Sequence, residues 1–134
     1  MEIPNEKQQE MIYQIQMFEQ QMQQIQQQLQ IIEQGIAELN ELNKGLDDLI
    51  GKNSGEILAQ IGRGIFVKAE LLSEELIVDI GGKKFVKKSI PETKEMIDKQ
   101  IKKLEEVYEQ LTESMEELNE EVLKMIGEME EEKS

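Results

Sequence analysis

The residues that could carry out covalent or acid–base chemistry in this sequence are few and poorly spaced. The chain contains no histidine and no cysteine, so it lacks the commonest general base and any thiol nucleophile. Residues 51–54 (Gly-Lys-Asn-Ser) partly match a phosphate-binding loop, but one residue too many separates their glycine from Gly45, and Asn53 stands where a Ser or Thr would hold magnesium. The adjacent acids Asp47 and Asp48 have no further ligands at metal-binding spacing. We therefore expect no catalytic, cofactor-binding or metal-binding site, and no enzyme.

Composition narrows the remaining functions. The chain has 134 residues and a formal net charge of −14, which argues against nucleic acid as a partner, because phosphate neutralisation needs clustered Lys and Arg. No apolar run approaches the ~18 residues of a membrane span. The first residues lack the basic and apolar regions of a signal peptide. We expect a cytoplasmic protein that contacts neither nucleic acid nor membrane.

Charge and glycine content divide the chain into three segments. Residues 1–50 carry nine acidic and two basic residues, and residues 92–134 carry fifteen acidic and six basic residues. Residues 51–91 carry five acidic and seven basic residues and six of the nine glycines. Two acidic segments therefore flank a mildly basic segment interrupted by glycines.

The first acidic segment has the pattern of a coiled-coil helix over residues 5–50. Asn5 and Gln8 form a plausible capping pair at its start, and Gly51 is a natural stop. Its apolar residues alternate between spacings of four and three, which is the repeat of about 3.5 residues typical of a left-handed coiled coil. This seam comprises Met11, Ile15, Phe18, Met22, Ile25, Leu29, Ile32, Ile36 and Leu39, and the frame continues through Asn43 to Leu46 and Ile50.

The last segment repeats the pattern over residues 91–131. Ser89 supplies a helix start, with Pro91 tolerated in the first turn and Glu92 favourable near the positive end of the helix dipole. Since the two helices have similar lengths, we expect them to pair antiparallel if the middle segment reverses the chain. The seam residues of this second helix are Ile97, Ile101, Leu104, Tyr108, Leu111, Met115, Leu118, Val122, Met125 and Met129.

The middle segment, residues 51–91, has the alternation of β-strands. Runs at residues 56–61, 65–71, 76–80 and 84–90 are separated by turns rich in Gly or Ser, which predicts two β-hairpins. The predicted fold class is α+β, mostly α: a single domain over residues 1–134 in which two β-hairpins join an antiparallel two-helix coiled coil.

Four short strands cannot enclose a core in one chain. An isolated hairpin is marginally stable in water, and unpaired apolar strand edges invite pairing with other chains. We therefore expect several chains to pool their hairpins into one sheet or an oligomeric β-barrel. The residues predicted to mediate this oligomerisation are Ile65, Phe66, Val67, Ala69, Leu71, Leu76, Ile77, Val78, Ile80 and Phe85.

The sequence resembles the prefoldin family, specifically its archaeal-type alpha class. The resemblance is carried by residues 61–69 (Ile-Gly-Arg-Gly-Ile-Phe-Val-Lys-Ala) and 76–82 (Leu-Ile-Val-Asp-Ile-Gly-Gly), placed between two long heptad helices. A middle segment with two hairpins is similar to the alpha class, whereas beta-class subunits have one. The resemblance implies a hetero-hexamer of two alpha and four beta subunits. It also implies an ATP-independent holdase chaperone that holds unfolded proteins and delivers them to a group II chaperonin.

The free ends of the helices carry apolar residues beyond the needs of the seam. Met is flexible and repacks against varied partners, so a Met-rich apolar tip suits promiscuous binding of unfolded clients. Two alternatives stay open: these residues broaden the seam or contact neighbouring helix pairs, and the chain as a whole is a coiled-coil scaffold or adaptor for one folded partner. The predicted client-binding tip residues are Ile3, Met11, Ile12, Ile15, Met17, Val122, Leu123, Met125, Ile126 and Met129.

Overall fold

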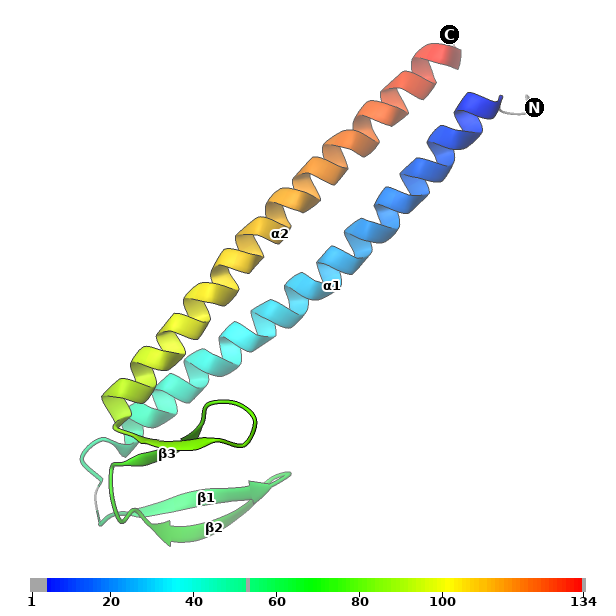
Figure 1. Ribbon diagram of the computed structural model, residues 1–134. Helices are drawn as coiled ribbons and strands as arrows, with labels where there is room; N and C mark the ends of the chain where they lie inside the picture. Colours follow the sequence, from blue (N-terminus) through cyan, green and yellow to red (C-terminus); the bar gives the residue numbers. More distant parts are fainter. Residues whose placement is uncertain (1–4, 53, 134) are drawn as a thin grey trace. The chain divides into compact units, whose positions relative to one another are not determined.

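The computed structural model describes residues 5–52 and 54–133, apart from the side chains of residues 132 and 133. It contains two long helices and two antiparallel β-hairpins, in the order helix, hairpin, hairpin, helix, which confirms the predicted fold class (Figure 1). The chain divides into two compact units. The terminal unit comprises residues 1–35 and 104–134, and the hairpin unit comprises residues 36–103.

Helix α1 (Glu6–Leu49) begins one residue later and ends one residue earlier than the predicted range of 5–50. The backbone N–H of Gln8 donates to Asn5 Oδ1 at 2.8 Å, and the N–H of Asn5 donates to Gln8 Oε1 at 3.2 Å, so the predicted capping pair is confirmed. The helix stops before Gly51, whose φ of 80° is left-handed and costs a glycine little. The N–H of Gly51 donates to Glu74 Oε1 at 2.7 Å, which fixes the end of α1 against the loop before the second hairpin.

Helix α2 (Ile90–Lys133) starts one residue earlier and ends two residues later than predicted. Ser89 is its N-cap, because the Ser89 Oγ accepts a hydrogen bond from the Glu92 N–H at 3.2 Å. Ile90 is the first residue of the helix rather than the last of the predicted strand at 84–90, and its side chain is buried at 2% exposure. The helix therefore begins where its first apolar residue reaches the core.

Each hairpin is a separate two-stranded sheet (Figure 1). Strand β1 (Glu56–Gly62) pairs with β2 (Ile65–Glu70), and β3 (Leu76–Asp79) pairs with β4 (Phe85–Lys88). Arg63 and Gly64 both have positive φ, the conformation that matches a two-residue turn to the twist of its strands. Gly82 and Lys83 do the same in the second hairpin. Three of the strands are shorter than predicted: residues 71, 80, 84 and 89 lie in the flanking loops, and residue 90 belongs to α2.

The core of the hairpin unit lies where the helix ends meet. Leu46, Ile90, Ile97 and Ile101 form a buried cluster, and partly buried residues pack around it: Ile36, Leu39, Leu49 and Leu76. Leu76 thus joins the second hairpin to the helices. The predicted seam position at Ile50 is wrong, because Ile50 follows the end of α1 and is exposed while Leu49 packs on the core.

In the terminal unit the helices run antiparallel, and the Tyr108 hydroxyl donates to Glu33 Oε1 at 2.7 Å between them. Most seam residues here are only half-buried, because a two-helix seam covers each side chain from one side. Among the described residues of this unit, the buried hydrophobic side chains are Met11 and Val122. No helix in the described residues is long and apolar enough to cross a membrane.

Candidate functional site

The hairpins expose large apolar side chains that a single chain leaves uncovered. Of the ten predicted oligomerisation residues, Ile65, Phe66, Val67, Ile77, Ile80 and Phe85 are exposed, whereas Ala69, Leu71, Leu76 and Val78 are half-buried. The half-buried members cannot all be free for a partner, since Leu76 already packs on the core of the hairpin unit. Oligomerisation through these residues remains a prediction.

The register of the first hairpin separates its two faces. Ile57 pairs with Ala69 and Ala59 with Val67, so these four side chains form one wholly apolar face. On the opposite face Gln60 pairs with Phe66, beside an ion pair at 4.0 Å between Lys68 Nζ and Glu56 Oε1. On this apolar face Val67 is exposed, whereas Ile57, Ala59 and Ala69 are half-buried. The face is therefore only partly covered, and no element in the described residues of this chain adds a third strand to the sheet.

Sequence reasoning missed three exposed residues of this surface: Leu58, Ile61 and Leu72. Leu72 is 83% exposed, in the loop that joins the two hairpins. Alternation within β1 could not have identified both Leu58 and Ile61, because their positions have opposite parity in the strand. Their signal is residue type alone, since both are large apolar residues of the predicted strand at 56–61. Leu72 has no periodic signal, because it lies outside any strand.

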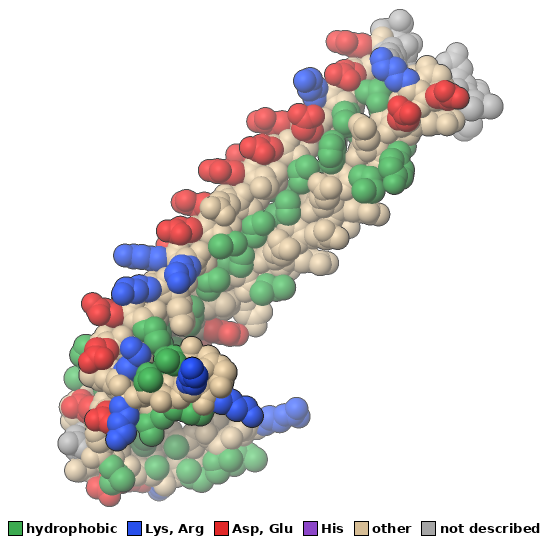
Figure 2. Space-filling model, in the orientation of Figure 1, with side chains coloured by type: hydrophobic (Ala, Val, Ile, Leu, Met, Phe, Trp, Pro, Cys, Tyr) green, Lys and Arg blue, Asp and Glu red, His purple; other side chains and the backbone are tan. Residues whose placement is uncertain are grey.

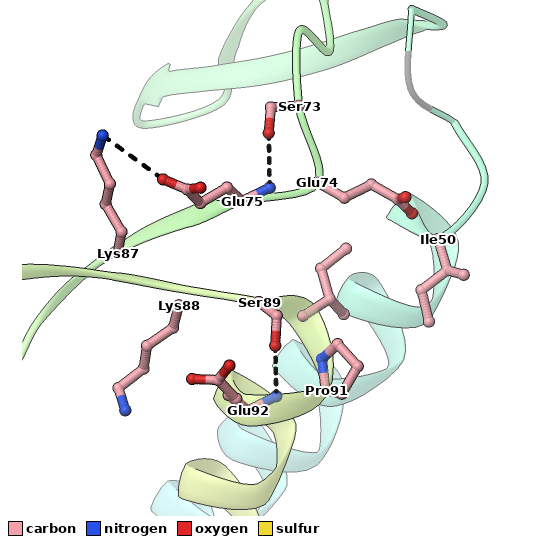
Figure 3. A pocket seen from close by; sticks show the side chains of 10 residues that line it. Ile50, Ser73, Glu74, Glu75, Lys87, Lys88, Ser89, Pro91 and Glu92 are labelled. Atoms are coloured by element: carbon pink, nitrogen blue, oxygen red, sulfur yellow. Dashed lines mark hydrogen bonds and ion pairs between the residues drawn. The ribbon is translucent and has the colours of Figure 1, made fainter.

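A pocket with a volume of about 600 Å³ lies between the second hairpin and the start of α2 (Figure 3). Ser73 and Ser89 line it, but both hydroxyl oxygens accept hydrogen bonds from backbone N–H groups, those of Glu75 and Glu92. Glu75 also pairs with Lys87 at 3.6 Å. These contacts hold the loop and the helix start in place, and neither serine has the adjacent base that a nucleophile requires.

The structure sorts the predicted tip residues into accessible and inaccessible sets. Met17, Leu123 and Ile126 are exposed, and Ile12, Ile15, Met125 and Met129 are half-buried. Met11 and Val122 are buried at 8% and 7% exposure, so they serve the seam and offer no accessible surface. Ile3 lies outside the described residues.

Four of the accessible tip residues line one groove of the terminal unit. Ile12 and Ile15 of α1 face Ile126 and Met129 of α2 across a cavity of about 380 Å³. Gln16 and Glu130 complete the lining. The groove is therefore an apolar slot with a polar edge, a geometry that can take up aliphatic side chains from another polypeptide.

The two units differ strongly in net charge. The terminal unit has seventeen acidic and three basic residues, a net of −14, whereas the hairpin unit has twelve of each and is neutral. On the face shown in Figure 2, acidic side chains gather along α2 in the terminal unit, beside a stripe of apolar side chains. The tip groove therefore lies in the unit that carries the whole net charge of the chain.

Comparison with known proteins identifies the family. The family model described as "Prefoldin subunit" matches residues 11–133. The chain belongs to the prefoldin family. Two curated relatives, both named prefoldin subunit alpha, are 34% identical over 93 residues (Methanobrevibacter smithii) and 30% identical over 95 residues (Methanosphaera stadtmanae). The expected alpha class is therefore confirmed.

The matches to these two relatives cover only part of each chain. Each covers 69% of this chain, and they span 64% and 67% of the lengths of the two relatives. A solved structure, the filamentous PFD of Methanocaldococcus jannaschii determined by cryo-electron microscopy, matches with a TM-score of 0.75 at 20% identity, over 85% of this chain and 96% of that one. At this identity the likeness shows the shared prefoldin fold.

Proposed function

We propose that this chain is the alpha-class subunit of an ATP-independent holdase chaperone. In this proposal it captures unfolded polypeptides at the tip groove and passes them to a group II chaperonin, and it acts in the cytoplasm. The observation that carries the proposal is the presence, in one prefoldin-family chain, of two separate apolar surfaces on units of very different charge. One surface suits permanent assembly and the other suits transient capture.

The hairpins, within residues 51–91, would supply the assembly surface. The apolar face of the first hairpin and the exposed Phe66, Ile77 and Phe85 would be covered by strands of beta-class subunits, in a complex of two alpha and four beta chains with a shared β-barrel. Burial of such side chains contributes roughly 1.5–3 kcal/mol each. The neutral charge of the hairpin unit adds no long-range repulsion to that association.

The tips would supply the client-binding surface. A groove of about 380 Å³ holds only a few side chains, so each contact with a client is weak. Several helix pairs of one oligomer would engage the same unfolded chain, and the effective concentration of the second and later contacts raises the overall affinity. Release then needs no nucleotide, because the weak contacts can be displaced one at a time at the chaperonin.

Client range separates this proposal from a scaffold or adaptor that binds one folded partner. The test is to measure light scattering of several unrelated proteins as they are diluted from denaturant, with and without the full chain and a candidate beta subunit, in the absence of nucleotide. A holdase suppresses aggregation of all of them in proportion to its concentration. Suppression of one protein only, or of none, would favour the adaptor.

A further inference from the structure

The tip groove combines a small apolar cavity with a strongly acidic surrounding. Its apolar lining comes from side chains on two turns of each helix, Ile12 with Ile15 and Ile126 with Met129. A Met side chain adapts its shape to varied aliphatic groups, so the cavity discriminates weakly between Leu, Ile, Val and Met. The cavity alone therefore selects for apolar character but not for a particular sequence.

Carboxylates lie directly beside this cavity. Glu130 lines it, and Glu19 is one helical turn beyond Ile15 on the same face of α1. Both residues are exposed, so their charges act through water within a Debye length of about 10 Å at 0.1 M salt. An unfolded segment that fills the cavity would place its flanking residues within this range.

A second surface hollow on α1 also has groups that attract cations. Tyr13 is exposed and shares a surface hollow with Glu6 and Glu10. An accessible aromatic ring between two carboxylates attracts an ammonium or guanidinium group, through the ring face and through charge. Tyr13 follows Ile12 in the chain, so this hollow lies at the same level of α1 as the cavity, about 100° around the helix from it.

We propose that the tip groove selects, among unfolded polypeptides, segments in which a short aliphatic run is flanked by Lys or Arg. This inference rests on the proposed function, because it names the clients that the holdase prefers. The aliphatic run fills the cavity and supplies affinity that does not depend on salt. The flanking cations meet the carboxylates near the cavity, Glu130 and Glu19, in a unit whose net charge is −14, and supply selectivity and a faster association rate. Segments flanked by acids are repelled, and so is a second tip of this chain.

The test uses the full chain and three fluorescent peptides of about 15 residues that share one central run of Leu, Ile and Val and differ only in their flanks, which are Lys, Ser or Glu. We expect the Lys-flanked peptide to bind roughly 10-fold more tightly than the Ser-flanked peptide at about 20 mM salt, and the Glu-flanked peptide to bind more weakly than both. At about 0.5 M salt, where the Debye length falls to about 4 Å, the three affinities should agree within about 2-fold. Stopped-flow mixing should locate most of the difference in the association rate.

Matched variants assign the effect to named residues. Glu19→Gln with Glu130→Gln should reduce the preference for Lys flanks, measured as the ratio of the Lys-flanked to the Ser-flanked affinity. The control carries the same two changes in the hairpin unit, Glu41→Gln with Glu95→Gln, both exposed, and should retain the preference. Ile126→Ser should weaken all three peptides together, whereas Ile31→Ser, at an exposed isoleucine outside the groove, should not.

The outcomes separate the inference from the proposed function. If all three peptides bind equally at low salt and Ile126→Ser weakens them, the selectivity is overturned and the holdase proposal stands. If no peptide binds and the chain fails to suppress aggregation, the proposed function itself fails. If the control variant loses the preference as much as the groove variant does, the selectivity belongs to the overall charge and not to this groove.

Discussion

In the hairpin unit, four residues from the helix ends form a buried cluster, while the strands beside them expose large apolar side chains. In the terminal unit, the seam is mostly half-buried, and acidic side chains outnumber basic ones by seventeen to three. The same two helices therefore form a well-buried apolar interface in the hairpin unit and a half-buried interface with a strongly charged surface in the terminal unit.

This difference indicates a division of tasks. A neutral unit with an apolar sheet can associate permanently, because burial of its strands meets no long-range charge repulsion. A unit with a net charge of −14 resists association with its own copies and stays accessible to transient ligands. Each of the following predictions challenges one side of this comparison.

The largest effect is expected for a charge on the strand surface. Phe66→Asp places a carboxylate in the surface that the proposed oligomer buries, which should cost several kcal/mol of association free energy. Native mass spectrometry of the chain with a beta subunit should show loss of the complex, while circular dichroism keeps most of the helical signal. Ile31→Asp, the same change at an exposed isoleucine of the terminal unit, is the control and should leave the complex intact. A complex that survives Phe66→Asp at micromolar concentration would place the assembly surface elsewhere.

A smaller effect is expected for cavities in the two seams. Ile97→Ala removes a side chain that is 2% exposed and belongs to the buried cluster, which should destabilise the chain by about 3 kcal/mol. Ile25→Ala makes the same change at a half-buried seam position of the terminal unit and should cost about 1–2 kcal/mol. Urea unfolding at one fixed protein concentration measures both values, because unfolding of an oligomer depends on concentration. Equal losses of stability in the two variants would show that the helix interface is equally well packed in both units.

Asn43 should be a stabilising position for an apolar residue. Its Nδ2 donates to Asp98 Oδ1 at 2.9 Å, but its own Oδ1 is buried with no hydrogen-bond partner among the described residues. Asn43→Leu removes that unsatisfied oxygen and leaves Asp98 exposed to water, so it should stabilise the hairpin unit by about 1 kcal/mol. Asn43→Asp would place two carboxylates together and should destabilise it. A loss of stability in Asn43→Leu would show that the Asn43–Asp98 bond matters more than the buried oxygen costs.

The smallest effect concerns Tyr108 in the terminal unit. The hydrogen bond to Glu33, and then the negative charge of Glu33, raise the pKa of the Tyr108 hydroxyl above its ordinary value. Because the folded pKa is raised, the contribution of this pair is complete at neutral pH and is lost as the pH rises through that value, above about pH 10. Tyr108→Phe should therefore weaken the alkaline decline in stability, measured by thermal unfolding from about pH 8 to pH 11. An unchanged decline would mean that Tyr108 does not contribute to it.

The sequence predicts the fold well because each element has a strong local signal. Regular spacings of four and three define both helices, the pair Asn5 and Gln8 defines one helix start, and glycines mark the turns. The end of α1 was less predictable, since Leu49 and Ile50 are both apolar and only the tertiary core shows that Leu49 is covered.

The candidate site was only partly predictable for a related reason. Residue type identifies Ile12, Ile126 and Met129 as tip residues, but not the groove that they share, because its walls come from two helices far apart in the chain. Burial of Met11 and Val122 depends on the partner helix, which heptad position alone does not describe. Exposure of Leu72 depends on the loop conformation and has no periodic signal.

The most direct test of the division between the two units is aggregation suppression by a tip variant whose assembly is intact. In the double variant Ile12→Ser with Ile126→Ser, both changes lie in the tip groove, whereas Ile31→Ser with Val107→Ser alters two exposed residues of the same helices outside it. We predict that native mass spectrometry finds the same complex for both variants, and that only the first loses most of its protection of unrelated denatured proteins. Full protection by the first variant would contradict capture at the tips and would point to the hairpin unit as the client-binding surface.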